Sequence, residues 1–565
     1  MPTATQPTPD QFADATWDDI APLFDELANR PLDATTADQW LADWSALEDA
    51  LSEAIQLASI AYSVDTTDPE KEAANLRFSS EIAPQMDEQR VRLSGRLLDL
   101  GSERDDLANV LREFRNQRDL FRPENVAVHQ RLEELNSNYN KITGGMTAEW
   151  DGEEVPLPRL SPFMQDQDRA TRERAFRKMT QPYVDQHDPL AAIFDKQYAL
   201  RQELAHNAGL ANYRDYAFRE NNRFDYTPAD CEAFHQAIEE TVVPALARRH
   251  ERRREQLGLD TVRPWDLGPD PFGRPALKPF ETVDEFTGTA EAIFHKVDPV
   301  LGNYFATMRR DGVLDLDSRK GKAPGGYCTS LPYQERPFIF MNAAGTASDV
   351  EVLLHEAGHA FHVFESLQLP LSFSRFPGAE MAEVGSMAME LLSAPYIAQD
   401  QGGYYSGEET RRARIEHLEG VLGVLPWIAT VDAFQHWIYT NDAGGDAGAR
   451  DAAWVEIFER FNAGVDWSGL EAQRLARWYR QLHIFLYPFY YIEYGIAQLG
   501  ALQVWRNSLD DQAAAVAAYR EALALGNTRP LPELFAAAGA HFSFDKQTVG
   551  ELVNLVEDLL AQLEN

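Results

Sequence analysis

Cysteine is scarce in this sequence, and its scarcity excludes one class of protein at once. The 565 residues contain two cysteines, Cys231 and Cys328. A secreted domain held together by disulfides carries a larger, regularly spaced set, so we expect no disulfide framework. So few cysteines fit a reducing compartment.

Long apolar runs and targeting signals are absent as well. No apolar stretch reaches the roughly 18 residues of a membrane-spanning helix. The first residues, MPTATQPTPDQFADATWDDI, have neither the basic start nor the apolar core of a secretory signal. We therefore expect a cytoplasmic protein without a membrane partner. Residues 1–12, rich in proline and threonine, are predicted to be a disordered tail.

Basic residues are outnumbered throughout the chain. There are 52 lysines and arginines against 90 acidic residues, which gives a net charge of −38 and a sequence pI near 4.7. Binding to nucleic acid depends on cationic side chains that neutralise phosphates, so a nucleic-acid partner is excluded. The acidic surface is interpreted as a source of solubility. Nothing in the sequence indicates an obligatory protein partner.

Most of the chain has the apolar periodicity of amphipathic helices, as at Leu107, Val110, Leu111 and Phe114. Asp151-Gly152, between two short alternating runs, predicts a β-hairpin near residues 146–157. Residues 325–342 have the composition of a second small β region. The fold class expected is therefore mostly α, with small β elements just before the chemistry.

The segment VEVLLHEAGHAFHVFE (residues 350–365) predicts a buried helix that carries a metal site. His355 and His359 are four residues apart, so both imidazoles project from one face and can bind one ion. Glu356 lies beside them, where it can act on a water without being a ligand. Zinc suits imidazole and carboxylate ligands with one open position. The alternative is a chance HExxH on a solvated helix, which the apolar content of this segment disfavours.

The third ligand decides between classes of zinc peptidase. A metzincin would place a histidine at the position of Glu365. A short-spaced glutamate-zincin would place its third ligand about twenty residues after His359, near Gly378 or Ala379, and neither residue has a side chain that can bind metal. The remaining candidates are Glu380, Glu383 and Glu390, on a helix predicted to begin after Pro377-Gly378. Glu380 is interpreted as a first-turn acid that interacts with the helix dipole. Glu383 and Glu390 share a face and suit a ligand and its supporting partner.

The combined motifs resemble a known family. HEAGHAFH (residues 355–362) followed by AEVGSMAME (residues 382–390) is similar to the thimet-oligopeptidase-like zinc peptidases, in the branch of oligoendopeptidase F and the Pz-peptidases. LNSNYNKITGG and DQDRATRERAFRK, between residues 135 and 178, also resemble that branch. The resemblance covers most of the chain from about residue 110. Gly385 replaces the alanine usual in the A-E-V-A-S segment.

The resemblance implies specific roles. Glu383 would complete a site for one Zn²⁺ with His355 and His359, supported by Glu390 and His362. GGYCTSLP and PFIFMNAAGT resemble strands of the active-site cleft, which makes substrate-binding residues of the following set: Tyr327, Phe340, Asn342 and Gly345. It also implies a helical N-terminal domain (13–200) and a catalytic domain (201–565). Two helix-rich domains would enclose a deep channel for short, unstructured peptides.

The family also has a tyrosine-rich segment over the substrate, matched here by HIFLYPFYYIEYGIAQ (residues 483–498). A peptidase needs donors for the oxyanion of the tetrahedral intermediate, and phenols or imidazole can supply them. Tyr487, Tyr491 and Tyr494 are spaced along one helical face, while Pro488 makes the register of His483 uncertain. An aromatic core is the preferred interpretation for Phe485, Phe489 and Tyr490. Which of Tyr487, Tyr490, Tyr491 and Tyr494 contacts the oxyanion is left open.

The predicted reaction is hydrolysis of internal peptide bonds, with Glu356 as general base and His483, Tyr491 or Tyr494 as oxyanion donors. Residues 337–342 are expected to present a β edge along which peptide binds. One alternative is a zinc aminopeptidase, although no segment for a free substrate amine is found. The other is a peptide-binding protein around a structural metal, which the presence of Glu356 disfavours.

Overall fold

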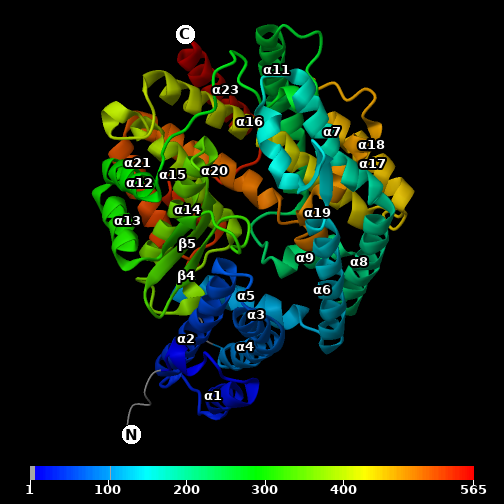
Figure 1. Cartoon of the computed structure of the whole chain (residues 1–565). Coiled ribbons are helices and arrows are strands. Elements are labelled where there is room, and N and C mark those ends of the chain that lie inside the picture. The colour runs from blue at the N-terminus through cyan, green and yellow to red at the C-terminus, as the bar shows by residue number, and fades with distance from the viewer. Residues whose placement is uncertain (1–6, 102–103) are drawn as a thin grey trace. The chain divides into compact units, whose positions relative to one another are not determined.

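Helices make up most of the chain in the computed structural model, which describes residues 7–101 and 104–565 (Figure 1). The mostly α class with small β elements is confirmed. Of the predicted tail, residues 1–6 lie outside the described residues. Pro9–Gln11 form a short 3-10 helix, and the following Phe12 is buried. Among the described helices, none is long and apolar enough to cross a membrane.

The chain divides into two compact units, each built from three separate segments. Unit 1 consists of Met1–Asp119, Leu277–Ala413 and Ala497–Phe542. Unit 2 consists of Leu120–Ala276, Arg414–Ile496 and Ser543–Asn565. Both units draw on residues from either side of position 200, and a domain boundary at that position stays a prediction.

Unit 1 combines helices with a small sheet. Its N-terminal helices pack around Trp40, Trp44 and Phe114, with the Trp44 and Phe114 rings stacked at 5.6 Å. The helices of unit 1 are α1 (Trp17–Asn29), α2 (Ala37–Val64), α3 (Pro69–Leu76), α4 (Ala83–Asp99), α5 (Ala108–Leu120), α12 (Val283–Val297), α13 (Pro299–Asp311), α14 (Ala347–Ser366), α15 (Ala379–Ser393), α21 (Gln512–Ala524) and α22 (Leu531–Ala537).

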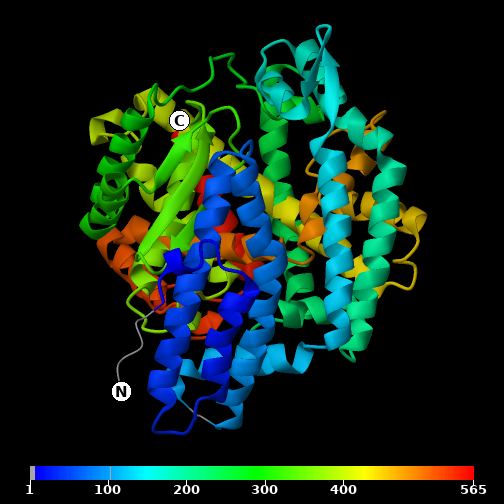
Figure 2. The same cartoon turned by 60° about the horizontal axis from the view of Figure 1, so that its bottom comes forward.

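The sheet of unit 1 has the strand order β3-β5-β4. Its strands are β3 (Leu314–Asp317), β4 (Tyr327–Leu331) and β5 (Arg336–Ala343). β5 pairs in parallel with β3 and antiparallel with β4, so it is the central strand. Helix α14 contacts both β4 and β5, and α2 runs alongside β4 (Figures 1 and 2). The chain leaves the central strand and enters α14 directly, which places HEAGH beside the sheet.

Unit 2 is helical apart from one hairpin. Strands β1 (Thr147–Trp150) and β2 (Glu153–Pro156) pair antiparallel, with left-handed Asp151 and Gly152 in the turn. Helices α6 and α8 lie side by side (Figure 1). The helices of unit 2 are α6 (Pro123–Gly144), α7 (Arg169–Asp185), α8 (His187–Asn207), α9 (Tyr213–Glu220), α10 (Pro228–Ala237), α11 (Val243–Leu257), α17 (Ala447–Arg460), α18 (Glu471–Arg480), α19 (Leu482–Leu486) and α23 (Lys546–Glu564). Two further helices, α16 (Gly407–Thr440) and α20 (Ile492–Asp510), contain the chain positions at which the units change.

Candidate active site

Helix α14 carries HEAGH, and its start is fixed by local hydrogen bonds. Thr346 Oγ1 accepts from the Asp349 N–H, and Asp349 Oδ2 accepts from the Thr346 N–H at 2.8 Å. This reciprocal capping box satisfies donors that a helix N-terminus leaves free. Gly345, with φ of +83°, makes the turn between β5 and the helix. The helix contains the whole predicted segment 350–365.

His355, His359 and Glu383 lie together in unit 1. His355 Nε2 is 3.3 Å and His359 Nε2 3.7 Å from Glu383 Oε2. One donor atom from each residue lies within 4.8 Å of the other two. Helix α15 brings in Glu383, and it begins at Ala379, directly after Pro377-Gly378 as predicted. Two imidazole nitrogens and a carboxylate at this spacing can hold one divalent cation.

The close approach of α14 and α15 depends on glycine. A Cβ at Gly358 would lie 2.6 Å from the carbonyl oxygen of Gly385 and 2.6 Å from the Cα of Ser386. Both neighbours are backbone, so no side chain fits at this crossing. A Cβ at Gly385 itself would lie 3.2 Å from Leu523 Cδ2. The replacement of the usual alanine by Gly385 thus accompanies tight packing against α21.

Glu390 orients His355. Its Oε1 lies 2.7 Å from His355 Nδ1, which leaves Nε2 directed at Glu383. A carboxylate on the far nitrogen fixes the orientation of a ligating imidazole and raises its basicity. Burial alone would lower the pKa of His355, but hydrogen bonds to Glu383 and Glu390 outweigh it and raise that pKa well above its ordinary value. The two carboxylates thus stabilise positive charge at this imidazole.

The remaining donors are held in the forms that bind metal. Burial lowers the pKa of His359 to about 4, so its imidazole is neutral at pH 7. For Glu383, burial opposes ionisation, but the hydrogen bond from His355 and the charges of both histidines keep its pKa below the ordinary value. Ser386 Oγ also donates to Glu383 Oε2 at 3.1 Å. Neutral imidazole and ionised carboxylate are the ligand states that a metal requires.

Glu356 is buried beside the triad, with 8% of its surface exposed. Burial raises the pKa of its carboxyl to about 7, although the charge of His355 and a hydrogen bond from the backbone of Cys328 in β4 oppose the shift. A carboxylate with a pKa near neutrality is suited to take and return a proton. The backbone of β4 thus contacts the candidate base of α14, a contact that the HEAGH motif alone does not predict.

His362 lies one turn beyond His359 and is 5% exposed. Burial lowers its pKa to about 3, and its Nε2 has no hydrogen-bond partner among the described residues. Its Nδ1 would lie 3.6 Å from a Cβ at Gly385, so the ring faces the helix crossing. Its supporting role for the metal site stays a prediction.

The prediction that residues 337–342 form a sheet edge is wrong, because β5 is central. Phe340 is fully buried, stacked on Tyr327 at 4.9 Å, and so is covered rather than available to substrate. Asn342 Nδ2 donates to the carbonyls of Ala323 and Gly325 at 2.8 and 3.0 Å. These contacts, with the Gly345 turn, shape the connection into α14. The substrate roles of Tyr327, Asn342 and Gly345 stay predictions.

The tyrosine segment, defined as residues 483–494, lies in unit 2. His483 packs on Tyr491 at 4.7 Å and on Tyr494 at 6.1 Å between ring centroids. Tyr494 in turn packs on Tyr490 and Tyr491, both at 5.4 Å. Tyr487 is 58% exposed. The structure therefore gathers the predicted oxyanion donors of this segment into one aromatic cluster.

A turn, not one helix face, brings these rings together. Helix α19 ends before Tyr487, and α20 begins only after Tyr491, so the predicted continuous helical register is wrong. Between them Phe489 adopts a left-handed backbone with φ of +66°. Its N–H donates to Gln435 Oε1 at 2.6 Å, and its carbonyl accepts from Arg223. Phe485 and Phe489 are buried core residues, as predicted, whereas Tyr490, also predicted to be core, is only half-buried.

Gln481 fixes the tautomer of His483. Trp427 Nε1 can only donate, and it lies 3.1 Å from Gln481 Oε1, so the amide nitrogen of Gln481 faces His483. That nitrogen lies 2.7 Å from His483 Nδ1, which must therefore accept. Burial lowers the pKa of His483 to about 4, so the ring is neutral at pH 7. Its single proton then sits on Nε2, where it can be donated.

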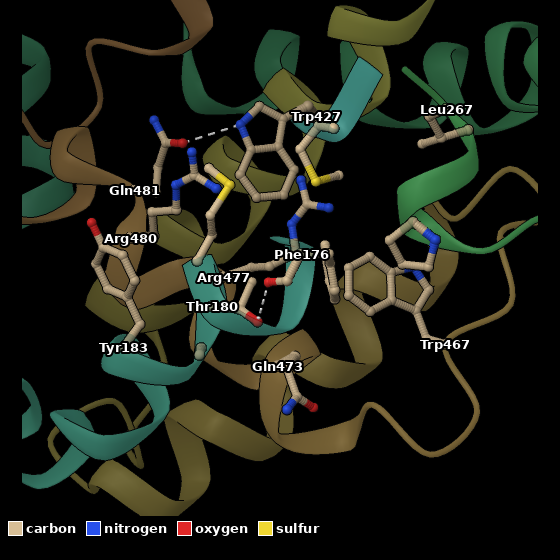
Figure 3. A pocket seen from close by; sticks show the side chains of 14 residues that line it. Phe176, Thr180, Tyr183, Leu267, Trp427, Trp467, Gln473, Arg477, Arg480 and Gln481 are labelled. Carbon is tan, nitrogen blue, oxygen red and sulfur yellow. Dashed lines mark hydrogen bonds between the residues drawn. The ribbon is translucent and has the colours of Figure 1, made fainter. Parts of the chain in front are cut away.

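A cavity of about 460 Å³ adjoins these residues in unit 2. Trp427, Trp467, Arg477 and Gln481 line it, and the Arg477 guanidinium lies 4.2 Å over the Trp427 ring (Figure 3). Burial and neighbouring Arg480 lower the pKa of Arg477 to about 10, so the guanidinium is still charged at pH 7. An aromatic cavity with a guanidinium can take an apolar group and an anionic one together.

Comparison with known proteins agrees with the motifs. Residues 162–552 match Peptidase family M3, and residues 9–119 match the Peptidase M3 N-terminal domain. An oligoendopeptidase F homolog of Borreliella burgdorferi is 21% identical over 71% of this chain and 67% of its own. The group B oligopeptidase PepB of Streptococcus agalactiae is 22% identical over 73% and 67%.

A solved structure of Pz peptidase A with an inhibitor has a TM-score of 0.87 and 26% identity, covering 99% of this chain and 98% of its own. The match covers almost the whole chain, so the likeness of fold is not confined to the HEAGH region. The chain belongs to Peptidase family M3, in its oligoendopeptidase F and Pz-peptidase branch.

Proposed function

We propose that this peptidase is a zinc-dependent oligoendopeptidase that hydrolyses internal bonds of short, unstructured peptides. The observation that carries the proposal is the convergence of His355, His359 and Glu383, with Glu356 beside them and Glu390 behind His355. The donor set fits zinc, since two imidazoles and one carboxylate leave a coordination position for substrate chemistry. Zinc bound there would polarise the scissile carbonyl and make water nucleophilic near neutral pH.

The residues around this site have distinct proposed roles in the reaction. Glu356 accepts a proton from the attacking water and returns it to the leaving amine, a role for which a pKa of about 7 is suited. Glu390 holds the His355 ring in its ligating orientation. His483, with its Nε2 proton, and the phenols of Tyr491 and Tyr494 are proposed as oxyanion donors. Selection of short peptides by a channel belongs to the same proposal.

Mass spectrometry of a library of N-blocked peptides tests the proposal. We expect internal cleavage of short peptides, its loss after a chelator, and its recovery when zinc is returned. Release of single N-terminal residues from unblocked peptides alone would support the aminopeptidase. Peptide binding without any cleavage by the zinc-loaded protein would support the non-enzymatic alternative.

A further inference from the structure

A second cluster of metal-binding side chains lies inside unit 2. Helix α10 contributes Cys231 and His235, and helix α16 contributes Asp432 and His436. Each pair is four residues apart, so both members project from one face of their helix. Donor atoms of Cys231, Asp432 and His436 all lie within 4.8 Å of one another. His235 Nε2 lies 2.7 Å from Asp432 Oδ2, so the fourth side chain adjoins this group.

The donor atoms of the cluster lie close enough together for one ion to bind several of them. His235 Nε2 lies 2.7 Å and His436 Nε2 3.3 Å from Asp432 Oδ2. Ligands at zinc distances in a tetrahedron are separated by roughly 3.5 Å, close to the His436–Asp432 distance, whereas the His235–Asp432 distance is that of a hydrogen bond. All four side chains are buried, with 0% exposure for Asp432 and 6% for His436. Phe218 and Phe489 pack on the His436 ring and exclude solvent from it.

Polar atoms in the cluster make no hydrogen bond among the described residues, although His436 Nε2 lies 3.3 Å from Asp432 Oδ2. Both ring nitrogens of His436 and Asp432 Oδ1 are buried without a hydrogen bond. Buried polar atoms of native proteins are nearly always satisfied, so Asp432 Oδ1 and one ring nitrogen of His436 indicate a missing ligand. A divalent cation would also balance a thiolate from Cys231 and the Asp432 carboxylate, giving a neutral site in an apolar interior.

We propose that Cys231, His235, Asp432 and His436 bind a structural Zn²⁺ ion, distinct from the ion of the HEAGH site. The donor set uses sulfur, imidazole and carboxylate, which zinc accepts together. Four protein ligands leave no position for substrate, and the burial of all four side chains keeps substrate away from the ion. Binding forms the zinc–sulfur bond and releases the Cys231 thiol proton to solvent.

The ion would stabilise the residues on which the turn of the tyrosine segment packs. Residue Gln435, next to His436, accepts the N–H of Phe489, and the Phe489 ring lies 5.4 Å from the His436 ring. Phe489 is the residue with the left-handed backbone on which the turn of that segment depends. Fixing α10 to α16 therefore fixes the support of this turn.

Cobalt substitution tests the site without reference to activity. The full chain is stripped with a chelator, loaded with Co²⁺, and measured for cobalt content and near-ultraviolet thiolate-to-cobalt absorption. We expect two cobalt ions per chain and a thiolate band in the wild-type protein. The HEAGH site offers no sulfur ligand, so the band reports the second site alone.

The chain supplies a matched pair of variants, since it has two cysteines. Cys231→Ser should lower the cobalt content from two to one and abolish the band. Cys328→Ser should change neither. A wild-type protein that binds one cobalt ion without a thiolate band overturns the proposal even if Cys231→Ser does not fold. A band that survives in Cys231→Ser overturns it as well.

Discussion

The two histidine clusters of this chain are built from the same local pattern yet differ in what surrounds them. In unit 1 the side chains of His355 and His359 are 24% and 22% exposed, and the Glu356 carboxylate, the proposed base, follows His355 in the chain. In unit 2 the histidines are buried and a cysteine lies beside them. Solvent exposure and a neighbouring carboxylate that is not a ligand are typical of catalytic zinc sites, whereas four protein ligands are typical of structural zinc sites. Spacing of four along a helix alone does not distinguish the two.

The largest effect is expected from a substitution that disrupts the HEAGH site and leaves the second cluster intact. His359→Ala removes a ligand, so cleavage should fall by far more than the 10–100-fold that outer partners cost. Cobalt content should fall from two ions to one while the thiolate band persists. Measurement of both on the same sample checks this. Loss of the band together with activity would show that the clusters are not independent.

A smaller effect is expected from Glu390→Gln. The amide can still accept from His355 Nδ1 but lacks the charge that raises imidazole basicity, so zinc affinity and activity should fall about 10–100-fold. Competition with a chelator of known affinity measures the change. An affinity equal to that of the wild type would remove Glu390 from the site.

The helix crossing predicts a stability difference between two glycines. Gly358→Ala forces a methyl against the backbone of α15 and should destabilise unit 1 by about 1–3 kcal/mol. Gly420→Ala, in helix α16, meets no atom within 4 Å and should be neutral or slightly stabilising. Denaturant unfolding compares the two variants. Equal stabilities would contradict the close approach at Gly358.

The smallest effect concerns a buried acid in neither cluster. Burial raises the pKa of Glu113 to about 7, despite a hydrogen bond from Asn527, whereas histidines keep Asp432 ionised. A raised carboxyl pKa adds stability below the unfolded value near 4.5, and that stability is lost as pH rises through about 7. Glu113→Gln, always neutral, should therefore be about 1–2 kcal/mol more stable than the wild type at pH 8.

At pH 4, where Glu113 is protonated in both states, the two proteins should be equally stable. Denaturant titrations at pH 4 and pH 8 measure the difference. A stability gap that is the same at both values would contradict the raised pKa.

Local spacing and the resemblance predicted residues that the structure brings together, namely His355, His359 and Glu383. Helix α14 contains the predicted segment, and α15 begins after Pro377-Gly378. The motif named the two histidines as candidate ligands, and the resemblance named Glu383. The tyrosine register failed because Pro488 and left-handed Phe489 interrupt the helix, and support from Gln435 has no local signature. The central position of β5 was equally hidden, since pairing with β3 is set by tertiary structure.

The second cluster was missed for the same reason. Cys231 and His235, like Asp432 and His436, show a spacing of four that could have drawn attention in the sequence. Their two helices are separated by about two hundred residues, so nothing local indicates that they pack together. The composition of each unit from three segments was likewise beyond periodicity and composition.

Replacement of Glu356 by glutamine tests the central claim most directly. The amide keeps the shape of the side chain but cannot accept the proton, so turnover of blocked peptides should fall by at least about 10²–10⁴-fold. Zinc at the HEAGH site should remain bound, as counted by metal analysis against the His359→Ala variant. A Glu356→Gln protein that retains zinc and cleaves at the wild-type rate would contradict the account.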